Sequence, residues 1–413
     1  MRVGLDFGTT NSSLACWKAP ELELVRFATK TGETPSFRSL LYFEKPGSGR
    51  LRAFAGPSAI EAYLEADTKG RLIQSLKSFL TSRALRSTEI FGQQAQIEDL
   101  IARIVRPMRE EAERQFGRPV TSVVAGRPVH FVGASTEEDN DYATERLRVA
   151  FGKAGFTEVE FELEPVAAAH HYASTLDHEE LILVGDFGGG TSDFSLLRVG
   201  GAKAELLGNE GVGLAGDALD AKIVRHVVSP ALGAGTSLRS FGKILPVPTW
   251  VYAKLERWHH LSLLRSRETL QMLETTRKQA IESERIEALL HLIHEDLGYR
   301  LHQAVQKAKV ELSQAPETTF RYYDGVADIE EKIARQDFEN WIGEELAAIE
   351  GCVDRLLQAT GVHARDVDAV FLTGGTSFVP AVQAVFSSRF GGERIRTGHE
   401  FTSVARGLAL RAA

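Results

Sequence analysis

The chain has 413 residues, which is enough for about two to three domains with an ample apolar core. Its composition is that of an ordinary globular protein, with 43% hydrophobic and 25% charged residues, and its net charge of -8 gives no overall attraction to nucleic acid or to an anionic membrane. It contains no apolar run of about 18 residues, and a strand is predicted directly after Met1 and Arg2, so we expect a cytoplasmic protein without a signal peptide. Cys16 and Cys352 lie in apolar segments and are expected to be buried free thiols, which fits a reducing compartment.

The first half of the chain is predicted to mix strands and helices. Apolar runs between turn residues predict strands, and apolar residues with a helical period predict helices. The expected strands are 3–6, 14–18, 22–27, 40–43, 120–125 and 159–163. The expected helices are 57–66, 72–80, 94–116, 136–154 and a small helix over 166–170.

The second half begins in the same way and then becomes largely helical. Strands are expected at 181–186, 194–199, 204–207, 318–323 and 370–373. Helices are expected at 217–228, at 268–313 with a break near Gly298, at 337–360 and at 402–413. Residues 229–250 are rich in Gly, Ser and Pro and are predicted to form an irregular connection.

Two stretches, 3–12 and 183–193, repeat one pattern: an apolar run, Asp-Phe-Gly, small and hydroxyl residues, and a second apolar run. Glycine lets backbone N–H groups approach a phosphate without a Cβ clash, and an aspartate at the end of the preceding strand can orient magnesium and its waters. One such motif alone would fit an ordinary hairpin turn, but the matched pair predicts two related halves that close on one nucleotide. The candidate binding residues are Asp6, Gly8, Thr9, Thr10 and Asn11 at the first tip, and Asp186, Gly188, Gly189, Gly190, Thr191 and Asp193 at the second.

Two more glycine-rich junctions are candidates for the same ligand. The strand at 370–373 runs into Gly374, Gly375 and Thr376, where an adenosine group could lie flat against the backbone. The segment 211–217 leads through Gly216 into a helix whose N-terminus could meet phosphate. Each junction alone is equally compatible with an ordinary turn from a strand into a helix.

Taken together, these motifs resemble the ATPase domain of the Hsp70 chaperones, within the superfamily of actins, sugar kinases and Hsp70, and most closely the short, YegD-like group of Hsp70 homologues. The segments 6–12 and 186–193 are similar to the two phosphate motifs of the family, and 372–380 is similar to its adenosine motif. The run 164–169 resembles the Glu-Pro-x-Ala-Ala-Ala hinge helix, and 309–313 resembles the Lys-x-x-Leu-Ser nucleoside segment. The resemblance implies an α/β protein with the actin-like ATPase fold: two ribonuclease-H-like lobes, each a mixed β-sheet flanked by helices, with the nucleotide in the cleft between them.

The resemblance also implies roles for individual residues. Asp6 and Asp186 would hold hydrated magnesium through water, and Thr191 would contact the γ-phosphate. Lys77 resembles the catalytic lysine that helps to hold the attacking water, although a lysine on an amphipathic helix is ordinarily a solvated charge. The implied catalytic set is Lys77, Glu164, Asp186, Thr191 and Asp193. The implied cofactors are ATP or ADP and Mg²⁺, with K⁺ as a further candidate.

The nucleoside contacts implied by the resemblance are Gly216, Lys309, Ser313 and Phe378, together with the glycines at 374 and 375. The chain departs from the family here, because Gln306 takes a glutamate position and Val310 an arginine position. Phe378 stands where an arginine commonly stacks on adenine, and its ring could stack instead. These changes leave the specificity for adenine open.

The predicted domains are a first lobe with a helical subdomain over 1–175, a second lobe over 176–375 and C-terminal helices over 376–413 that pack back at the lobe junction. An enlarged helical subdomain is expected at about 229–320. The sequence ends where the ATPase domain of the family ends, so we expect no peptide-binding domain. The region 250–313 is interpreted either as a helical subdomain with its own core or as a surface for a co-chaperone, an exchange factor or a client protein.

These features predict an Hsp70-like chaperone protein that binds ATP and hydrolyses it slowly, with lobe closure gated by nucleotide and read by a partner. Slow turnover is expected because carboxylates are weak bases at neutral pH, so catalysis depends on positioning and charge neutralisation. The alternatives are an actin-like filament or scaffold protein, a small-molecule kinase of the same superfamily, and a nucleotide sensor without hydrolysis. His291 and His294 have no matched carboxylate or cysteine set in the sequence, so no metal site is predicted there.

Overall fold

The computed structural model describes residues 1–18, 21–30, 32–47, 49–66, 70–173, 176–200, 203–240, 243–257, 264–396 and 403–412. The chain divides into two compact units. The first comprises Met1–Gly213, Ile349–Ser377 and Ala384–Ala413, and the second comprises Leu214–Ala348 and Phe378–Gln383. The first unit contains both large sheets, so the proposed boundary between lobes near residue 175 falls inside it and stays a prediction.

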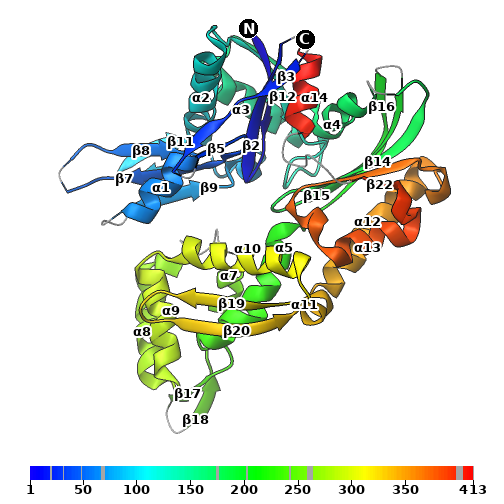
Figure 1. The fold of residues 1–413 in the computed structure, drawn as a ribbon. Coiled ribbons are helices and arrows are strands. Elements are labelled where there is room, and N and C mark those ends of the chain that lie inside the picture. The colour runs from blue at the N-terminus through cyan, green and yellow to red at the C-terminus, as the bar shows by residue number, and fades with distance from the viewer. Residues whose placement is uncertain are drawn as a thin grey trace. The chain divides into compact units, whose positions relative to one another are not determined.

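The first large sheet has the strand order β13-β12-β1-β2-β3, and β6 pairs with β2 beside this path. Figure 1 labels β2, β3 and β12 of this sheet. β1 pairs antiparallel with β2 and parallel with β12, so the sheet is mixed. Alternate residues of β1 (Val3, Leu5 and Phe7) lie in a core that also contains residues of α2 and α3, while Gly4 packs against α14. The strands are β1 (Arg2–Phe7), β2 (Asn11–Lys18), β3 (Glu21–Leu24), β6 (Phe37–Arg38), β12 (Ser122–Arg127) and β13 (Glu158–Leu163), and the helices are α2 (Ile97–Phe116), α3 (Glu137–Ala154), α4 (Glu164–Ala173) and α14 (Ser403–Arg411).

The second large sheet repeats this arrangement with the order β16-β15-β14-β21-β22. β14 pairs antiparallel with β15 and parallel with β21, as β1 does with β2 and β12. This shared pairing is the structural counterpart of the repeated sequence motif. The strands are β14 (Glu180–Phe187), β15 (Ser192–Gly200), β16 (Lys203–Val212), β21 (Ala369–Thr373) and β22 (Ile395–Arg396), followed or flanked by α12 (Gly343–Thr360), α13 (Pro380–Phe390) and the 3₁₀ helices η4 (Ala364–Asp366), η5 (Gly375–Phe378) and η6 (Gly392–Arg394).

Smaller elements complete the first unit, and one sequence prediction fails among them. The helix expected over 72–80 is wrong, because the residues form strand β9 (Arg71–Gln74) and one 3₁₀ turn, η1 (Leu76–Phe79). β9 pairs with β7, and Ser75 has a φ of 56°, which no α-helix contains. The remaining elements are β4 (Phe27–Thr29), β5 (Gly32–Thr34), β7 (Leu40–Glu44), β8 (Arg52–Ala55), α1 (Pro57–Glu65), β10 (Ser87–Ile90) and β11 (Gln93–Gln96).

The second unit is mainly helical. The stretch 268–313 forms three helices, and the expected break near Gly298 is confirmed because α10 begins at that residue. The prediction of an irregular connection over 229–250 is wrong, since part of it pairs as the β17–β18 hairpin. The elements are α5 (Gly216–Ile223), the π-helical turn η2 (Val224–Val228), α6 (Ser229–Ala231), β17 (Ser237–Ser240), β18 (Lys243–Pro246), α7 (Trp250–Leu255), α8 (Arg267–Gln279), α9 (Ser283–His294), α10 (Gly298–Gln314), β19 (Glu317–Tyr323), β20 (Asp328–Ala334) and α11 (Arg335–Trp341).

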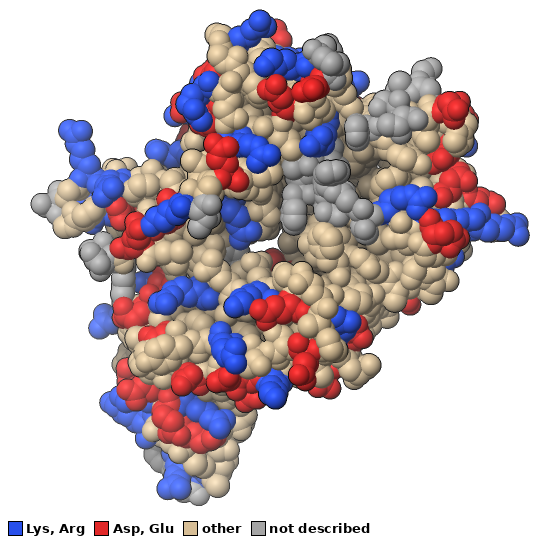
Figure 2. All heavy atoms as spheres, viewed as in Figure 1, with Lys and Arg blue, Asp and Glu red and all other residues tan. Residues whose placement is uncertain are grey.

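The cysteines, the helix lengths and the surface charge bear on expectations drawn from the composition. Cys16 and Cys352 are buried and free, as predicted. Among the described residues, no helix is both long and apolar enough to span a bilayer. Figure 2 shows basic and acidic side chains interspersed on the face drawn.

Candidate functional site

The first glycine-rich tip joins β1 to β2. Phe7 and Ser12 form the last pair of the hairpin ladder, so Gly8, Thr9 and Thr10 lie at its tip. A Cβ at Gly8 would overlap the carbonyl oxygen of Asn11, so only glycine fits this tight turn. The Asn11 side-chain oxygen accepts a hydrogen bond from Arg38 Nη1 at 3.3 Å, which fixes the amide group beside the tip.

The second tip joins β14 to β15 and carries more side-chain contacts. Asp186 and Asp193 are directly opposite each other in the ladder, and the Gly188 N–H donates to the Thr191 carbonyl at 2.9 Å. The Thr191 hydroxyl donates to Asp193 Oδ2 at 3.1 Å, and the Thr373 hydroxyl donates to Asp186 Oδ1 at 2.7 Å. Thr373 was not predicted as a site residue, although it stands at the end of the strand that leads into the Gly374 junction.

Lys77 and Glu164 form a buried ion pair, with 2.6 Å between Nζ and Oε1. Lys77 lies on η1, and Glu164 is the first residue of α4. The Lys77 side chain is only 8% exposed, and that of Glu164 is 12% exposed. The alternative interpretation of Lys77 as a solvated surface charge is therefore wrong.

The pKa values of Asp6, Lys77, Glu164 and Asp193 are shifted by burial and by the charges of neighbouring groups, Asp186 among them. Burial raises the pKa of Asp6 to about 8, and the charge of Glu164 contributes to this rise. Burial also raises the pKa of Asp193 to about 7, aided by the charge of Asp186, and it raises the pKa of Glu164. Burial alone would lower the pKa of Lys77, but the charges of Glu164, Asp6 and Asp186 raise it above its usual value. The carboxyl groups outnumber the single lysine, so the cluster has room for the positive charge of a hydrated divalent cation.

The junction after β21 packs against the second tip. Gly374 has a φ of 86°, and a Cβ there would overlap the carbonyl oxygen of Phe187, so this position requires glycine. A Cβ at Gly375 would have no atom within 4 Å, and the residue is exposed, whereas the Thr376 side chain is buried. The backbone at Gly375 is thus the accessible part of the predicted adenosine motif.

The predicted nucleoside residues of the second unit form a connected set. Lys309 Nζ donates to the Gly216 carbonyl at 3.3 Å and lies 2.7 Å from Asp220 Oδ1. The Ser313 hydroxyl donates to the Lys309 carbonyl at 3.0 Å, within α10. Asp220 was not predicted as a site residue; it is buried and ties α5 to α10 through Lys309.

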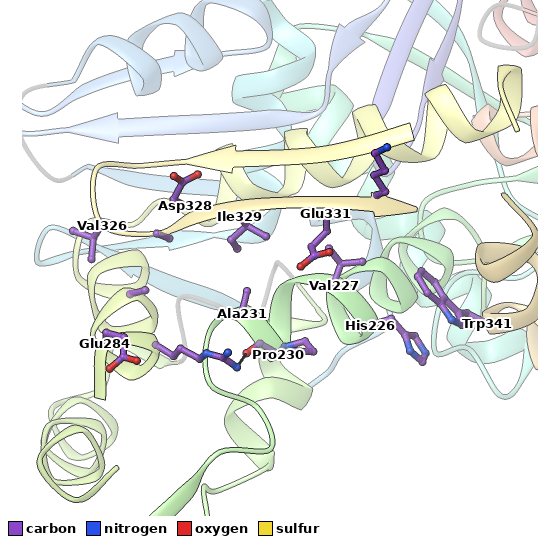
Figure 3. Close-up of a pocket in the computed structure, with 14 residues that line it drawn as sticks. His226, Val227, Pro230, Ala231, Glu284, Val326, Asp328, Ile329, Glu331 and Trp341 are labelled. Atoms are coloured by element: carbon purple, nitrogen blue, oxygen red, sulfur yellow. Dashed lines mark hydrogen bonds between the residues drawn. The ribbon is translucent and has the colours of Figure 1, made fainter. Parts of the chain in front are cut away.

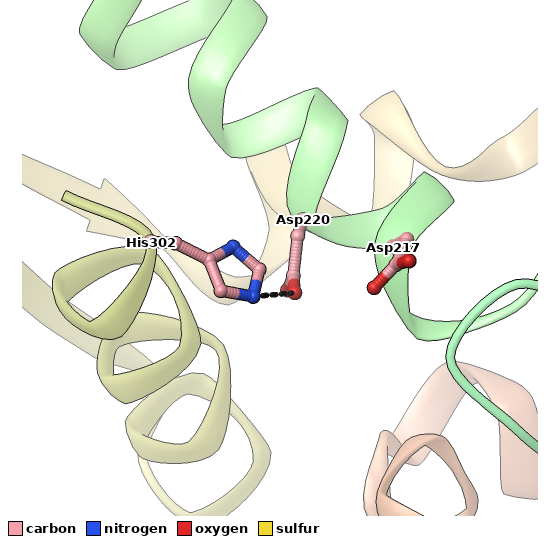
Figure 4. Close-up of side chains that lie close together, drawn as sticks. All are labelled: Asp217, Asp220 and His302. Carbon is pink, nitrogen blue, oxygen red and sulfur yellow. Dashed lines mark ion pairs between the residues drawn. The ribbon is translucent and has the colours of Figure 1, made fainter. Parts of the chain in front are cut away.

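Asp220 also faces an imidazole. Figure 4 shows Asp217, Asp220 and His302 gathered at one place, with His302 Nε2 at 4.0 Å from Asp220 Oδ2. Their ligand atoms lie within 4.8 Å of one another. The ammonium group of Lys309 already neutralises Asp220, so we interpret the group as support for Lys309.

Two of the three residues that depart from the family pattern are well exposed, and Gln306 is half-buried. Val310 is 54% exposed and Phe378 is 43% exposed. Phe378 groups with the second unit, as do Gly216 and Lys309, whereas the phosphate-type residues belong to the first unit. Both side chains can therefore meet a ligand without rearrangement of their own surroundings.

A cavity of about 650 Å³ in the second unit contains none of the predicted site residues (Figure 3). It lies beside β20, α9 and η2, and the rings of His226 and Trp341 stack at its edge with 4.4 Å between centroids. Its lining includes Val227, Arg285, Ile329 and Glu331. The cavity is separate from the residues to which the sequence assigns chemistry.

The repeated pairing of the two large sheets and the glycine-rich tips that they carry agree with a comparison against known families. The family described as Hsp70 protein matches residues 64–233 and 290–413, which is well over half of the chain. The chain belongs to the Hsp70 family, and its fold is accordingly the mixed α/β fold of the actin-like ATPases.

Individual relatives match along nearly the whole chain. The chaperone protein DnaK of Thermosipho melanesiensis is 26% identical over 100% of this chain and 59% of its own length. DnaK of Thermus thermophilus is 26% identical over 99% of this chain and 60% of its own, and the chloroplastic heat shock 70 kDa protein 6 of Arabidopsis thaliana is 25% identical over 99% and 52%. The chain therefore spans little more than half the length of these relatives.

Proposed function

We propose that this chain binds ATP and hydrolyses it slowly as the nucleotide-dependent part of an Hsp70-like chaperone. The observation that carries the proposal is the buried Lys77–Glu164 pair, which shares one electrostatic cluster with Asp6, Asp186 and Asp193 at two glycine-rich tips. An isolated hairpin turn gives no reason to bury so many ionisable groups together, since burial disfavours their charged forms.

In this mechanism the chain positions water and phosphate and forms no covalent intermediate. Magnesium, when bound, would neutralise charge on the phosphates, and Asp6 and Asp186 would hold its waters. Lys77 Nζ donates to the attacking water and to phosphate oxygen, and Glu164 keeps the lysine charged and oriented. When phosphate binds, the Thr191 hydroxyl would turn its single proton from Asp193 to the terminal phosphate. Turnover is proposed to be slow because catalysis rests on positioning and charge neutralisation.

The nucleoside is proposed to contact Lys309, Ser313, Gly216 and the exposed backbone of Gly375. Phe378 offers an aromatic face in place of a cation, which supports stacking on a planar base. The preference for adenine is a prediction that nucleotide competition would measure.

Closure of the protein on nucleotide is proposed to be read by a partner protein at 250–313. In the described part of this region, Trp250 and Ile281 are exposed, while Leu255, Leu273 and Leu289 are buried. This pattern supports a helical subdomain with its own core that also presents apolar side chains. Residues 258–263, which carry Trp258 and two histidines, lie outside the described residues. The cytoplasmic location stays a prediction.

Single-turnover ATP hydrolysis with magnesium tests the proposal, with nucleotide affinity measured separately. In Lys77→Ala we expect hydrolysis to fall by about 10²-fold or more while ATP affinity is kept, because the lysine acts mainly on the transition state. Thr191→Ala should lower hydrolysis for the same reason. The matched control is Lys307→Ala, since this lysine is 77% exposed on α10 and should leave the rate unchanged.

Each result of this experiment has a distinct meaning. Slow turnover that depends on Lys77 supports the ATPase. Tight ATP binding without turnover in the parent would contradict hydrolysis and favour a nucleotide-gated scaffold. Absence of ATP binding would mean that the resemblance extends to the fold alone.

A further inference from the structure

The lysine at the centre of the proposed mechanism lies on an element that cannot fix its own position. η1 is a single 3₁₀ turn with poor hydrogen-bond geometry and no helical neighbour in sequence. It is entered through Ser75, whose φ of 56° is unfavourable for a residue with a Cβ. Something outside the turn must therefore determine where Lys77 lies.

Leu76 and Leu80 supply part of this anchor. Both side chains are buried in the apolar core of the first unit. Apolar packing is not directional, so it holds the turn against the core without fixing the rotation of the turn about its axis. The direction of the Lys77 side chain depends on that rotation.

A buried arginine supplies the directional contacts. Arg146, from α3, reaches the end of η1, and its Nη1 donates to the carbonyls of Phe79, Leu80 and Ser82 at 3.2, 3.0 and 3.2 Å. Its Nε donates to Glu98 Oε1, from α2. The Arg146 side chain is 6% exposed and that of Glu98 is 14% exposed, so both charges are largely withdrawn from water.

These hydrogen bonds are directional, so they can fix the rotation of η1, which apolar packing alone cannot do. The carbonyls at the end of a helical turn carry partial negative charge and can accept hydrogen bonds from a cation. Phe79 is the last residue of η1, Leu80 follows it directly and Ser82 lies two residues further on. One cation therefore ties the end of the turn and the segment after it to α3, which fixes the position and the rotation of the turn together. The carboxylate of Glu98 holds that cation in place, because an unpaired buried guanidinium would be strongly unfavourable.

We propose that Arg146, held by Glu98, is a positioning residue for Lys77. Its role is to fix η1 so that the lysine ammonium meets Glu164 and the reacting water. The inference rests on the proposed function where it concerns hydrolysis, but the position of the ammonium group is measurable without ATP.

The experiment compares Arg146→Met, Arg146→Lys and Glu98→Gln with the parent. The control is Arg103→Met on α2, because Arg103 is exposed. Three quantities are measured in protein that circular dichroism shows to be folded: the single-turnover rate, the ATP dissociation constant, and the rate at which acetic anhydride labels Lys77 in nucleotide-free protein, read by mass spectrometry.

For Arg146→Met we expect the turnover rate to fall by about tenfold or more, because displacement of a catalytic group by about 1 Å can cost 10²-fold. The ATP dissociation constant should stay close to that of the parent, and labelling of Lys77 should become several-fold faster as the buried pair loosens. Arg146→Lys should give intermediate values, since an ammonium group cannot reach three carbonyls and a carboxylate with fixed geometry. Arg103→Met should match the parent in all three measurements.

Unchanged turnover and unchanged Lys77 labelling in folded Arg146→Met would overturn the proposal. A uniform rise in labelling at every lysine would also overturn it, since that result marks general loosening. If Arg146→Met does not fold, Arg146→Lys and Glu98→Gln decide by the same criteria. If the parent hydrolyses no ATP, the proposed function fails, and the labelling of Lys77 alone decides the positioning role.

Discussion

Gly407, inside α14, marks a close crossing with α4 that a single methyl group should disrupt. A Cβ built on Gly407 would lie 1.6 Å from the carbonyl oxygen of Ala167 and 2.5 Å from its carbonyl carbon. These are backbone atoms and cannot move aside as a side chain could. Gly407→Ala is therefore expected to push the two helices apart.

The size of the effect follows from the required displacement. Real Cβ contacts are essentially never shorter than 3.0 Å, so the crossing must open by at least 1.4 Å, the difference between 3.0 and 1.6 Å. This movement loosens the apolar contacts among Val124, Ala167 and Leu408. Overpacking costs about 1–3 kcal/mol, and we take the upper end because the clashing atoms belong to the backbone. Alanine in a helix gains at most about 1 kcal/mol over glycine, so we expect a net loss of about 2 kcal/mol.

Urea unfolding followed by circular dichroism measures the change. The matched control is Gly152→Ala in α3, where nothing lies within 4 Å of the added Cβ, and where stability should stay equal or rise. Because α4 begins at Glu164, Gly407→Ala should also speed acetic anhydride labelling of Lys77. A Gly407→Ala protein as stable as the parent would refute the close crossing of α14 and α4.

Three further predictions concern charge, ligand and thiols. In metal-free protein the pKa of Asp6 is about 8 in the folded chain and 3.8 in the unfolded chain. Between these values the folded chain keeps a proton that the unfolded chain releases. The free energy of unfolding should therefore fall as the pH rises from about 4 to 8, by up to about 1.4 kcal/mol per pH unit. Urea titrations from pH 5 to 8 should show a shallower fall for Asp6→Asn, and equal slopes would contradict the assignment. Phe378→Ala should weaken ATP binding by about 0.5–1.5 kcal/mol in calorimetry if the ring stacks on the base, and an unchanged affinity would exclude stacking. Burial raises the pKa of the Cys352 thiol to about 11, so an aromatic disulfide reagent should react slowly with it until urea unfolds the chain, and rapid reaction in the folded state would contradict its burial.

The local parts of the candidate site were readable from the sequence. Each glycine-rich tip is contiguous, and its glycines, hydroxyl residues and preceding aspartate have meaning at fixed short spacing. The flanking apolar runs therefore predicted both hairpins, and the break at Gly298 was predicted for the same reason. The family resemblance rested on these local signals and is confirmed by the comparisons.

The long-range parts were decided only by the tertiary structure. Lys77 and Glu164 are 87 residues apart in sequence, and Asp186 and Thr373 are 187 apart. The expected helix at 72–80 became a strand and a short turn, because hydrogen bonds to β7 outweighed the weak helical preference of the segment. Local patterns report the conformations that a segment favours, whereas pairing, burial and the clamping of a turn by Arg146 depend on residues that meet only when the chain has folded.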